Sequence, residues 1–385
     1  MIDSGTTPAR TRRDWATIKF SLLAEGARVT PSAESALVHS KMPLRTRSGV
    51  SGGLDLQIAD GIDVNVPVSE MFVRMSPYTI DHDGNTFVVM RGEDSICNAN
   101  PLPLPSYYEL RTADDTEAMH RIAQMCSADR LCFGMTGPTC HFWRRDRRCQ
   151  YCSIGKNFSA DAARKQQRHL LEVLDASLVD NRLPARHLLI GGGTPSGPDM
   201  GAILASELCR SVKERHDIQI YVMIAAPIDN SYIDMLKDAG ADELGMNLEF
   251  WSDEAWQKYI PGKNDLIGKN RYLSALEHAV EKFGPINTRS ILIAGLEDAS
   301  YTREAAAFLA GLGVMPIVSP FRSLDGTMLQ DSRGFKGDKY VKLWSAIESD
   351  LAGTGIPLGP VCVPCQNNTL AIPNPTHIAP VLVKR

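Results

Sequence analysis

The sequence lacks any long hydrophobic run, and several classes of protein are excluded by what is missing. No apolar stretch approaches the roughly 18 residues that a membrane-spanning helix needs. The opening residues, MIDSGTTPARTRRDW, lack the apolar core of a signal peptide. Neither charge sign dominates, since 41 Lys and Arg residues stand against 45 Asp and Glu residues. We therefore expect a soluble, cytoplasmic protein that has neither a membrane nor a nucleic-acid polymer as its partner.

Common catalytic signatures are also missing. The chain has no HExxH, Walker or GxGxxG pattern, and it has no internal repeat or low-complexity tract. Its 385 residues are 43% hydrophobic and 22% charged, which excludes wholesale disorder. The length fits two or three domains, or one barrel with extensions.

Strand-like and helix-like segments alternate over the middle of the chain. Short apolar runs that predict strands lie near 131–137, 187–191, 218–224, 243–249, 289–295 and 314–319. Helical patterns follow them near 160–178, 199–214, 230–239, 265–283 and 301–312. This alternation predicts an α/β protein with a parallel sheet covered by helices. Six such units fit a partial (β/α)6 barrel of the TIM type, and a doubly wound sheet is the alternative; both place function at the carboxyl ends of the strands.

Three regions follow from this reading. We expect an N-terminal accessory region at 1–120, the partial barrel at 121–325 and a C-terminal segment at 326–385 that caps the barrel. The last region is rich in glycine and proline after a helix near 336–351.

The nine cysteines point to metal binding or catalysis rather than to disulfides, because their number is odd and the chain is long. Cys140, Cys149 and Cys152 follow the first predicted strand with the spacing CX8CX2C. Three thiolates on a four-iron cluster leave one iron free to bind a small molecule through amino and carboxylate groups. Zinc is the alternative, with Cys132 or His141 completing its ligands.

The segment from 126 to 325 resembles the radical S-adenosylmethionine (SAM) superfamily. In that family three cysteines hold a [4Fe-4S] cluster after the first strand of a partial barrel, with an aromatic residue before the last cysteine. Tyr151 occupies that place, whereas the first gap is five residues longer than the usual CX3CX2C. The resemblance implies an electron donor of the flavodoxin or ferredoxin type and a small-molecule substrate.

The resemblance also implies which residues contact SAM. The glycine-rich turn after the second strand lacks the usual acidic residue, and the fifth strand, which ends near Asp298, lacks the first glycine of the family's GxIxGxxE stretch. The implied SAM-binding residues are Tyr151, Gly191, Gly192, Gly193, Thr194, Asn247, Glu249, Ile293, Ser319 and Arg322. No residue is assigned to the step on the substrate.

A second cysteine pair, Cys362 and Cys365, lies in the C-terminal segment. It predicts an auxiliary iron–sulfur cluster, completed by Cys132, Cys126 or Cys97. A zinc knuckle and ordinary or reversibly oxidised thiols are the alternatives. This order of cysteines resembles a radical SAM family found beside nitrilase genes, and sulfur-inserting members such as biotin and lipoyl synthases.

The predicted activity is therefore reductive cleavage of SAM to a 5′-deoxyadenosyl radical that modifies a small metabolite. Sulfur insertion from the auxiliary cluster, of the kind that forms the thio-sugar of albomycin, is the favoured outcome. A rearrangement or dehydrogenation, with the auxiliary cluster as electron conduit, is the runner-up. A zinc-stabilised binding protein without redox chemistry is the alternative of another class.

Overall fold

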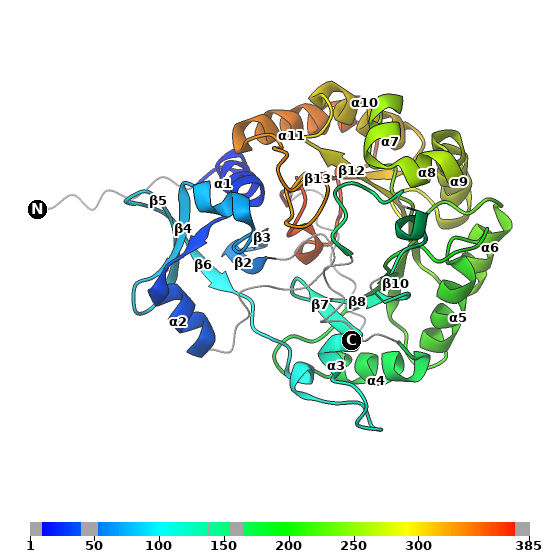
Figure 1. Ribbon diagram of the computed structural model, residues 1–385, viewed down its shortest axis with the longest axis horizontal. Coiled ribbons are helices and arrows are strands. Elements are labelled where there is room, and N and C mark those ends of the chain that lie inside the picture. Colours follow the sequence, from blue (N-terminus) through cyan, green and yellow to red (C-terminus); the bar gives the residue numbers. More distant parts are fainter. Residues whose placement is uncertain (1–9, 40–52, 138, 146, 155–164, 374–385) are drawn as a thin grey trace, which may run out of the picture.

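Six parallel strands form the centre of the molecule and curl into an open barrel wall (Figure 1). The computed structural model describes residues 10–39, 53–137, 139–145, 147–154 and 165–373. The parallel strands are β8 (Arg130–Gly134), β9 (His187–Gly191), β10 (Gln219–Met223), β11 (Glu243–Gly245), β12 (Thr288–Ala294) and β13 (Met315–Pro320). A further strand, β7 (Ala123–Cys126), pairs antiparallel with β8 at one edge. The strands lie side by side in chain order, which a doubly wound sheet does not do.

Each parallel strand is followed by helix, so the chain has the six predicted strand–helix units. The helices are α4 (Gln167–Leu178), α5 (Ala202–Lys213), α6 (Ser231–Asp238), α7 (Asp253–Tyr259), α8 (Pro261–Leu266), α9 (Lys269–Phe283), α10 (Ala299–Gly311) and α11 (Gly337–Leu351). They form the outer layer around the strands (Figure 1). The α/β partial barrel expected from the alternation is thereby confirmed at the level of its layers and strand order.

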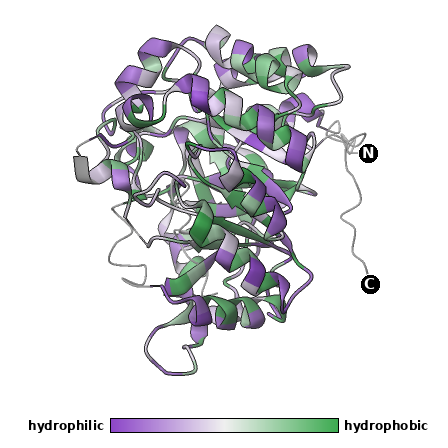
Figure 2. Ribbon diagram, turned by 90° about the vertical axis from the view of Figure 1, so that its right-hand side faces the viewer, coloured by the Kyte–Doolittle hydropathy of each residue, from purple (hydrophilic) through white to green (hydrophobic). Residues whose placement is uncertain are grey.

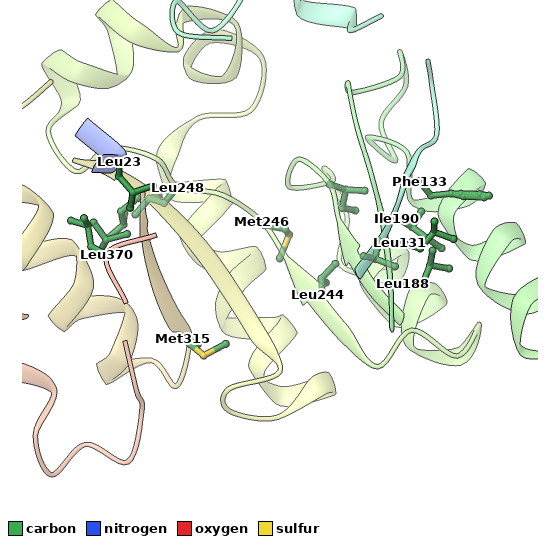
Figure 3. Packing of buried hydrophobic residues seen from close by; sticks show 14 of the residues in the cluster. Leu23, Leu131, Phe133, Leu188, Ile190, Leu244, Met246, Leu248, Met315 and Leu370 are labelled. Carbon is green, nitrogen blue, oxygen red and sulfur yellow. The ribbon is translucent and has the colours of Figure 1, made fainter. Parts of the chain in front are cut away.

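Alternation of side chains along each strand explains this arrangement. Leu131 pairs with Leu188, and Phe133 with Ile190, on the neighbouring strands β8 and β9. All four side chains are buried, and Figure 3 shows them gathered on one side of the two strands. Cys132 lies between Leu131 and Phe133 on β8, so its side chain points the other way, and it lines the interior cavity. Hydrophobic colour accordingly concentrates on the central strands in Figure 2.

A second, six-stranded sheet lies beside the barrel. Its order is β1-β4-β5-β6-β2-β3, and only β1 and β4 are parallel. Its strands are β1 (Arg28–Val29), β2 (Leu54–Ala59), β3 (Ile62–Val66), β4 (Tyr78–His82), β5 (Phe87–Arg91) and β6 (Asp94–Pro101). The remaining helical segments are α1 (Arg12–Glu25), α2 (Pro31–His39), α3 (Met119–Ile122) and the 3-10 turns η2 (Met71–Met75), η3 (Ser106–Glu109), η4 (His141–Arg145) and η6 (Pro364–Gln366). Helix α1 packs against α11, which joins this unit to the barrel.

The C-terminal tail (residues 352–373) closes the gap between the two sheets. Its Leu370 donates a backbone hydrogen bond to Val318 of β13 at 2.7 Å. On the other side, Asn65 of β3 donates its backbone N–H to Asn367 at 2.8 Å. The tail therefore lies inside the ring of elements seen in Figure 1 and connects the barrel edge to the N-terminal sheet.

A buried lysine fixes this tail to α1. Lys19 is fully buried, and its Nζ donates to the carbonyl oxygens of Gln366 and Ala371, each at 2.8 Å. Burial lowers the pKa of Lys19 to about 7, against a smaller raising effect of Asp63. Within the described ranges, no helix is long and apolar enough to span a membrane.

This lysine predicts a pH dependence of stability. Between pH 7 and the ordinary lysine pKa, the unfolded chain binds a proton that the folded chain does not, so the free energy of unfolding rises with pH. We expect the wild type to gain about 2 kcal/mol between pH 7 and pH 9 relative to Lys19→Met. Urea unfolding of both proteins measures this difference, and parallel pH profiles would contradict the shifted pKa.

Candidate active site

An elongated cavity of about 370 Å³ runs inside the barrel, a volume in the range of small-molecule sites. At the carboxyl end of the strands it is lined by Cys140, Cys149 and Cys152. Towards the amino end it is lined by Cys132 and Cys365. One continuous space therefore connects the two groups of cysteines that the sequence singles out.

The cysteine loop (Cys140 to Cys152) is fixed by the glycine turn (residues 191–194) that follows β9. The backbone N–H of Thr194 donates to Cys140 Sγ at 3.4 Å, and the N–H of His141 donates to the Thr194 carbonyl at 2.7 Å. Gly193 makes this approach possible, because a Cβ there would stand 1.8 Å from the carbonyl oxygen of Thr139. The glycine turn thus positions Cys140, although the turn lies some fifty residues further along the chain.

The other two cysteines are supported by the helices after β11. Gln150, between them, donates its N–H to the carbonyl of Tyr259 at 2.8 Å, and the N–H of Gly262 contacts the Arg147 carbonyl at 3.0 Å. Burial raises the pKa of Cys152 to about 11 and raises that of Cys149 further. Both thiols are therefore neutral without a metal, and metal binding must displace their protons.

The three thiols of the loop share one part of the cavity lining. Cys140, Cys149 and Cys152 all line the cavity, and the thiols of Cys140 and Cys152 are close enough to raise the pKa of Cys149. Three thiolates fit a [4Fe-4S] cluster that leaves one iron open to a small molecule.

A buried ion pair lies beside these thiols. Glu249 Oε1 accepts from Lys263 Nζ at 2.8 Å, and both side chains are buried and line the cavity. Glu249 has a left-handed backbone (φ 69°), held by hydrogen bonds with Ile291 and Ile293 on β12. Its second oxygen, Oε2, is buried and has no hydrogen-bond partner among the described residues. A ligand hydroxyl or amino group in the cavity would satisfy this acceptor.

Lys263 lies in the first turn of α8, within a Pro-Gly-Lys motif that is compatible with an exposed turn or with a cation over the active face. In the structure its Nζ is desolvated, and the attraction of Glu249 more than offsets the effect of burial, so the pKa of Lys263 is raised. The lysine therefore stays charged and neutralises the carboxylate at the cavity wall.

Most of the residues implied by the resemblance line one cavity wall. They are Tyr151, Gly191, Gly192, Gly193, Thr194, Asn247, Glu249 and Ser319. Ile293 is not among the lining residues; Ile291, two residues earlier on the same face of β12, is. Together with the three thiols and the unsatisfied Glu249 oxygen, this wall fits a cluster with SAM bound to it.

Arg322 has a different place from the one implied. It is buried and donates to Asn65 of the N-terminal sheet, at 3.0 Å to Oδ1 and 2.9 Å to the backbone oxygen. It does not line the cavity. The residue follows β13 as expected, but its side chain connects the barrel to the neighbouring sheet.

The second cysteine pair meets two residues that the sequence analysis missed. Cys365 Sγ lies 3.1 Å from His187 Nε2 and 2.6 Å from Cys362 Sγ, and Asp129 is close by. Asp129 precedes β8 and His187 begins β9, so both lie at the amino end of the barrel. Their positions before two apolar strand segments were a usable signal, because the amino ends of parallel strands meet at one edge.

The other proposed partners of that pair lie on different elements of the fold. Cys126 and Cys132 are on β7 and β8 and influence Cys365 or one another electrostatically. Cys97 is buried in β6 of the N-terminal sheet. Cys209 is buried on α5, as expected for a core residue.

The site combines an α/β partial barrel with three thiols at the carboxyl end of its strands. The family model described as the Radical SAM superfamily matches residues 146–309. Over this segment the chain is similar to the radical SAM superfamily. The match includes Cys149 and Cys152 and begins after Cys140.

A curated plant protein is similar to this chain over part of its length. The chain is 25% identical over 259 residues to the ATP-citrate synthase subunit alpha chain protein 1 of Oryza sativa subsp. japonica, covering 63% of this chain. It spans 61% of that relative's length, which is less than two thirds.

Among solved structures, methylornithine synthase (PylB) is 14% identical, with 65% of this chain and 79% of that chain covered and a TM-score of 0.44. SuiB of Streptococcus suis is 13% identical, with 51% and 42% covered and a TM-score of 0.37. The radical SAM methyltransferase TsrM of Kitasatospora setae is 15% identical, with 48% and 36% covered and a TM-score of 0.35.

The contact between the glycine turn and the cysteine loop gives a testable prediction. Gly193→Ala places a methyl group against the Thr139 backbone, so we expect the free energy of unfolding to fall by about 3 kcal/mol and the reconstituted iron content to fall with it. Gly134→Ala is the matched control, because its Cβ meets only the flexible end of Lys165 at 3.4 Å. Equal iron content in the two variants would show that the contact does not position the cluster.

Proposed function

We propose that this protein is a radical SAM enzyme that modifies a small molecule held in the barrel cavity. The observation that carries the proposal is the set of three thiols on the lining of a cavity that also holds a carboxylate oxygen without a hydrogen-bond partner among the described residues. The superfamily match over residues 146–309, which includes Cys149 and Cys152, supports it.

The residues divide the work between binding the cluster and binding SAM. Cys140, Cys149 and Cys152 would hold a [4Fe-4S] cluster with one iron open to SAM. When bound and reduced, such a cluster would supply the electron that cleaves the C5′–S bond of SAM into methionine and a 5′-deoxyadenosyl radical, the species that takes a hydrogen atom from a substrate C–H bond. The Thr194 N–H donates to the Cys140 sulfur, and a hydrogen bond of this kind raises the potential of a cluster.

The Glu249–Lys263 ion pair would orient a ligand bound in the cavity. Lys263 holds one oxygen of Glu249, so the other oxygen has a fixed direction into the cavity wall. A fixed acceptor binds a ribose hydroxyl or an amino group with little reorganisation. We propose that Glu249 is this acceptor and that Lys263 is its positioning residue.

The size of the cavity supports a small substrate. Its lining comes from the barrel strands and from the tail, which contributes Cys365, Asn368 and Thr369. A site inside a barrel shields a reactive radical from water. We propose a metabolite rather than a polymer as the substrate.

The electron donor is proposed to dock near the cysteine loop. Arg147 and Arg148 adjoin Cys149, with Arg147 paired to Asp265 at 2.9 Å and Arg148 stacked on Trp143 at 5.4 Å. A positive surface next to the cluster would attract an acidic donor of the flavodoxin or ferredoxin type.

Loss of one loop thiolate is the direct test of SAM cleavage. With dithionite under anaerobic conditions, Cys149→Ala should form 5′-deoxyadenosine at less than about a thousandth of the wild-type rate, because a two-thiolate site cannot hold the cluster. Cys209→Ala, which removes a buried thiol of α5, should keep the wild-type rate. Chromatography of the nucleoside product measures both, and unchanged formation in Cys149→Ala would refute the ligand assignment.

Sulfur insertion stays a prediction from the sequence. It is supported by one observation, namely that Cys132 and Cys365 line the same cavity as Cys140, so a sulfide held there would face the same substrate. The transfer to a nucleoside sugar is one reaction of this type. A rearrangement or dehydrogenation needs no sulfide donor and is the second candidate.

Isotope labelling distinguishes these outcomes. Protein reconstituted with ³⁴S-sulfide should release product that carries the label if an auxiliary cluster donates sulfur. Cys132→Ala should then abolish product labelling while 5′-deoxyadenosine formation continues. Product without the label, formed at the rate of SAM cleavage, would rule out insertion and favour the second candidate. Mass spectrometry of the product is the measurement.

A further inference from the structure

We propose that the amino end of the barrel binds one four-coordinate metal ion of the zinc class, independent of the cluster site. Its ligands are four side chains, hereafter the base site: Asp129, His187, Cys362 and Cys365. One ligand atom from each lies within 4.8 Å of all the others.

The distances within the base site suit ligands that converge on one ion. His187 Nε2 lies 3.1 Å from Cys365 Sγ and 3.9 Å from Cys362 Sγ. The two sulfurs are 2.6 Å apart. An ion with Zn–S bonds of about 2.3 Å would separate the sulfurs to roughly 3.7 Å, which side-chain rotation alone can supply.

A carboxylate oxygen of Asp129 supplies an independent indication of a cation site. Its Oδ1 is buried and has no hydrogen-bond partner in the described ranges, although it stands 3.9 Å from His187 Nδ1. An unsatisfied buried carboxylate oxygen is costly, and a cation at the centre of the base site would satisfy it. The backbone oxygen of Asp129 accepts from Arg186 at 2.7 Å, so the residue is held in place.

The charges also balance for a divalent ion. Two thiolates, one carboxylate and a neutral imidazole around M²⁺ leave a net charge of −1. The guanidinium of Arg130 is close enough to interact electrostatically with Cys365, and it donates to Cys126 Sγ at 3.3 Å. One fixed positive charge therefore faces one negative complex.

A cubane cluster fits the base site less well. It would bind each cysteine to a different iron and hold those sulfurs further apart than the ligands of one ion. Its third thiolate would have to come from outside the base site, from Cys132 of β8, whereas the base site itself offers an imidazole and a carboxylate. Two sulfurs, one nitrogen and one oxygen are the ligand types of zinc.

The ion would join parts of the chain that are far apart in sequence. Asp129 immediately precedes the first barrel strand and His187 begins the second, and the cysteines lie more than 170 residues beyond His187 on the tail. Four protein ligands leave no open position, which is typical of structural sites. The ion would therefore clamp the tail as the floor of the cavity.

The test separates this site from the cluster site. In the full chain with Cys140, Cys149 and Cys152 all changed to alanine, Co²⁺ should bind at one ion per chain and give the intense visible bands of a tetrahedral thiolate complex, and Zn²⁺ should displace it. Cys365→Ala and His187→Ala, added to that variant, should each weaken Zn²⁺ binding by at least about a hundredfold. Cys97→Ala is the matched control and should bind as before.

Measurements on the otherwise wild-type chain guard against a variant that fails to fold. Elemental analysis should find one zinc beside the cluster iron, and His187→Ala should lose the zinc and keep the iron. Hydrogen exchange of residues 358–372 should be slower with zinc than after chelation. Iron and labile sulfide in the triple-alanine chain would overturn the proposal in favour of an auxiliary cluster, and a Cys362–Cys365 disulfide unaffected by zinc would overturn it in favour of a redox pair.

Discussion

A contact between two stretches of backbone fixes the carboxyl end of the barrel. Gly193 lies against Thr139 so closely that no side chain fits between them, and this brings the Thr194 N–H to the sulfur of Cys140. The second strand thereby positions the loop that follows the first strand. The three cysteines of the loop and the cavity residues beside them take their places relative to this contact.

The two cysteine groups differ in geometry although both contain a CX2C pair. Cys149 and Cys152 share the cavity lining with a third thiol, Cys140, whereas the sulfurs of Cys362 and Cys365 touch and converge with a histidine and a carboxylate. Three thiolates favour a polynuclear cluster, and converging sulfur, nitrogen and oxygen ligands favour one ion. If a redox-inert ion occupies the base site, sulfur transfer has no donor built on the tail cysteines, and the radical must serve another reaction.

The sequence predicted what depends on neighbours in the chain and missed what depends on folding. Six apolar segments locate the parallel strands within a few residues, because period and length are local properties. The spacing of Cys140, Cys149 and Cys152 grouped them as one predicted site, and all three line the same cavity. His187 and Asp129 were not, because only the fold brings them to the tail. Arg322 shows the same limit, since its place after β13 indicates the end of the barrel but not the direction of its side chain.

The attachment of the tail has a consequence for biosynthesis. Lys19 is made early, yet the carbonyls that accept from its amine belong to Gln366 and Ala371. During translation, the barrel therefore exists for a time without its floor, and its interior is open from below. Inorganic cofactors can be loaded in that interval, before the last turns of the nascent chain seal the interior.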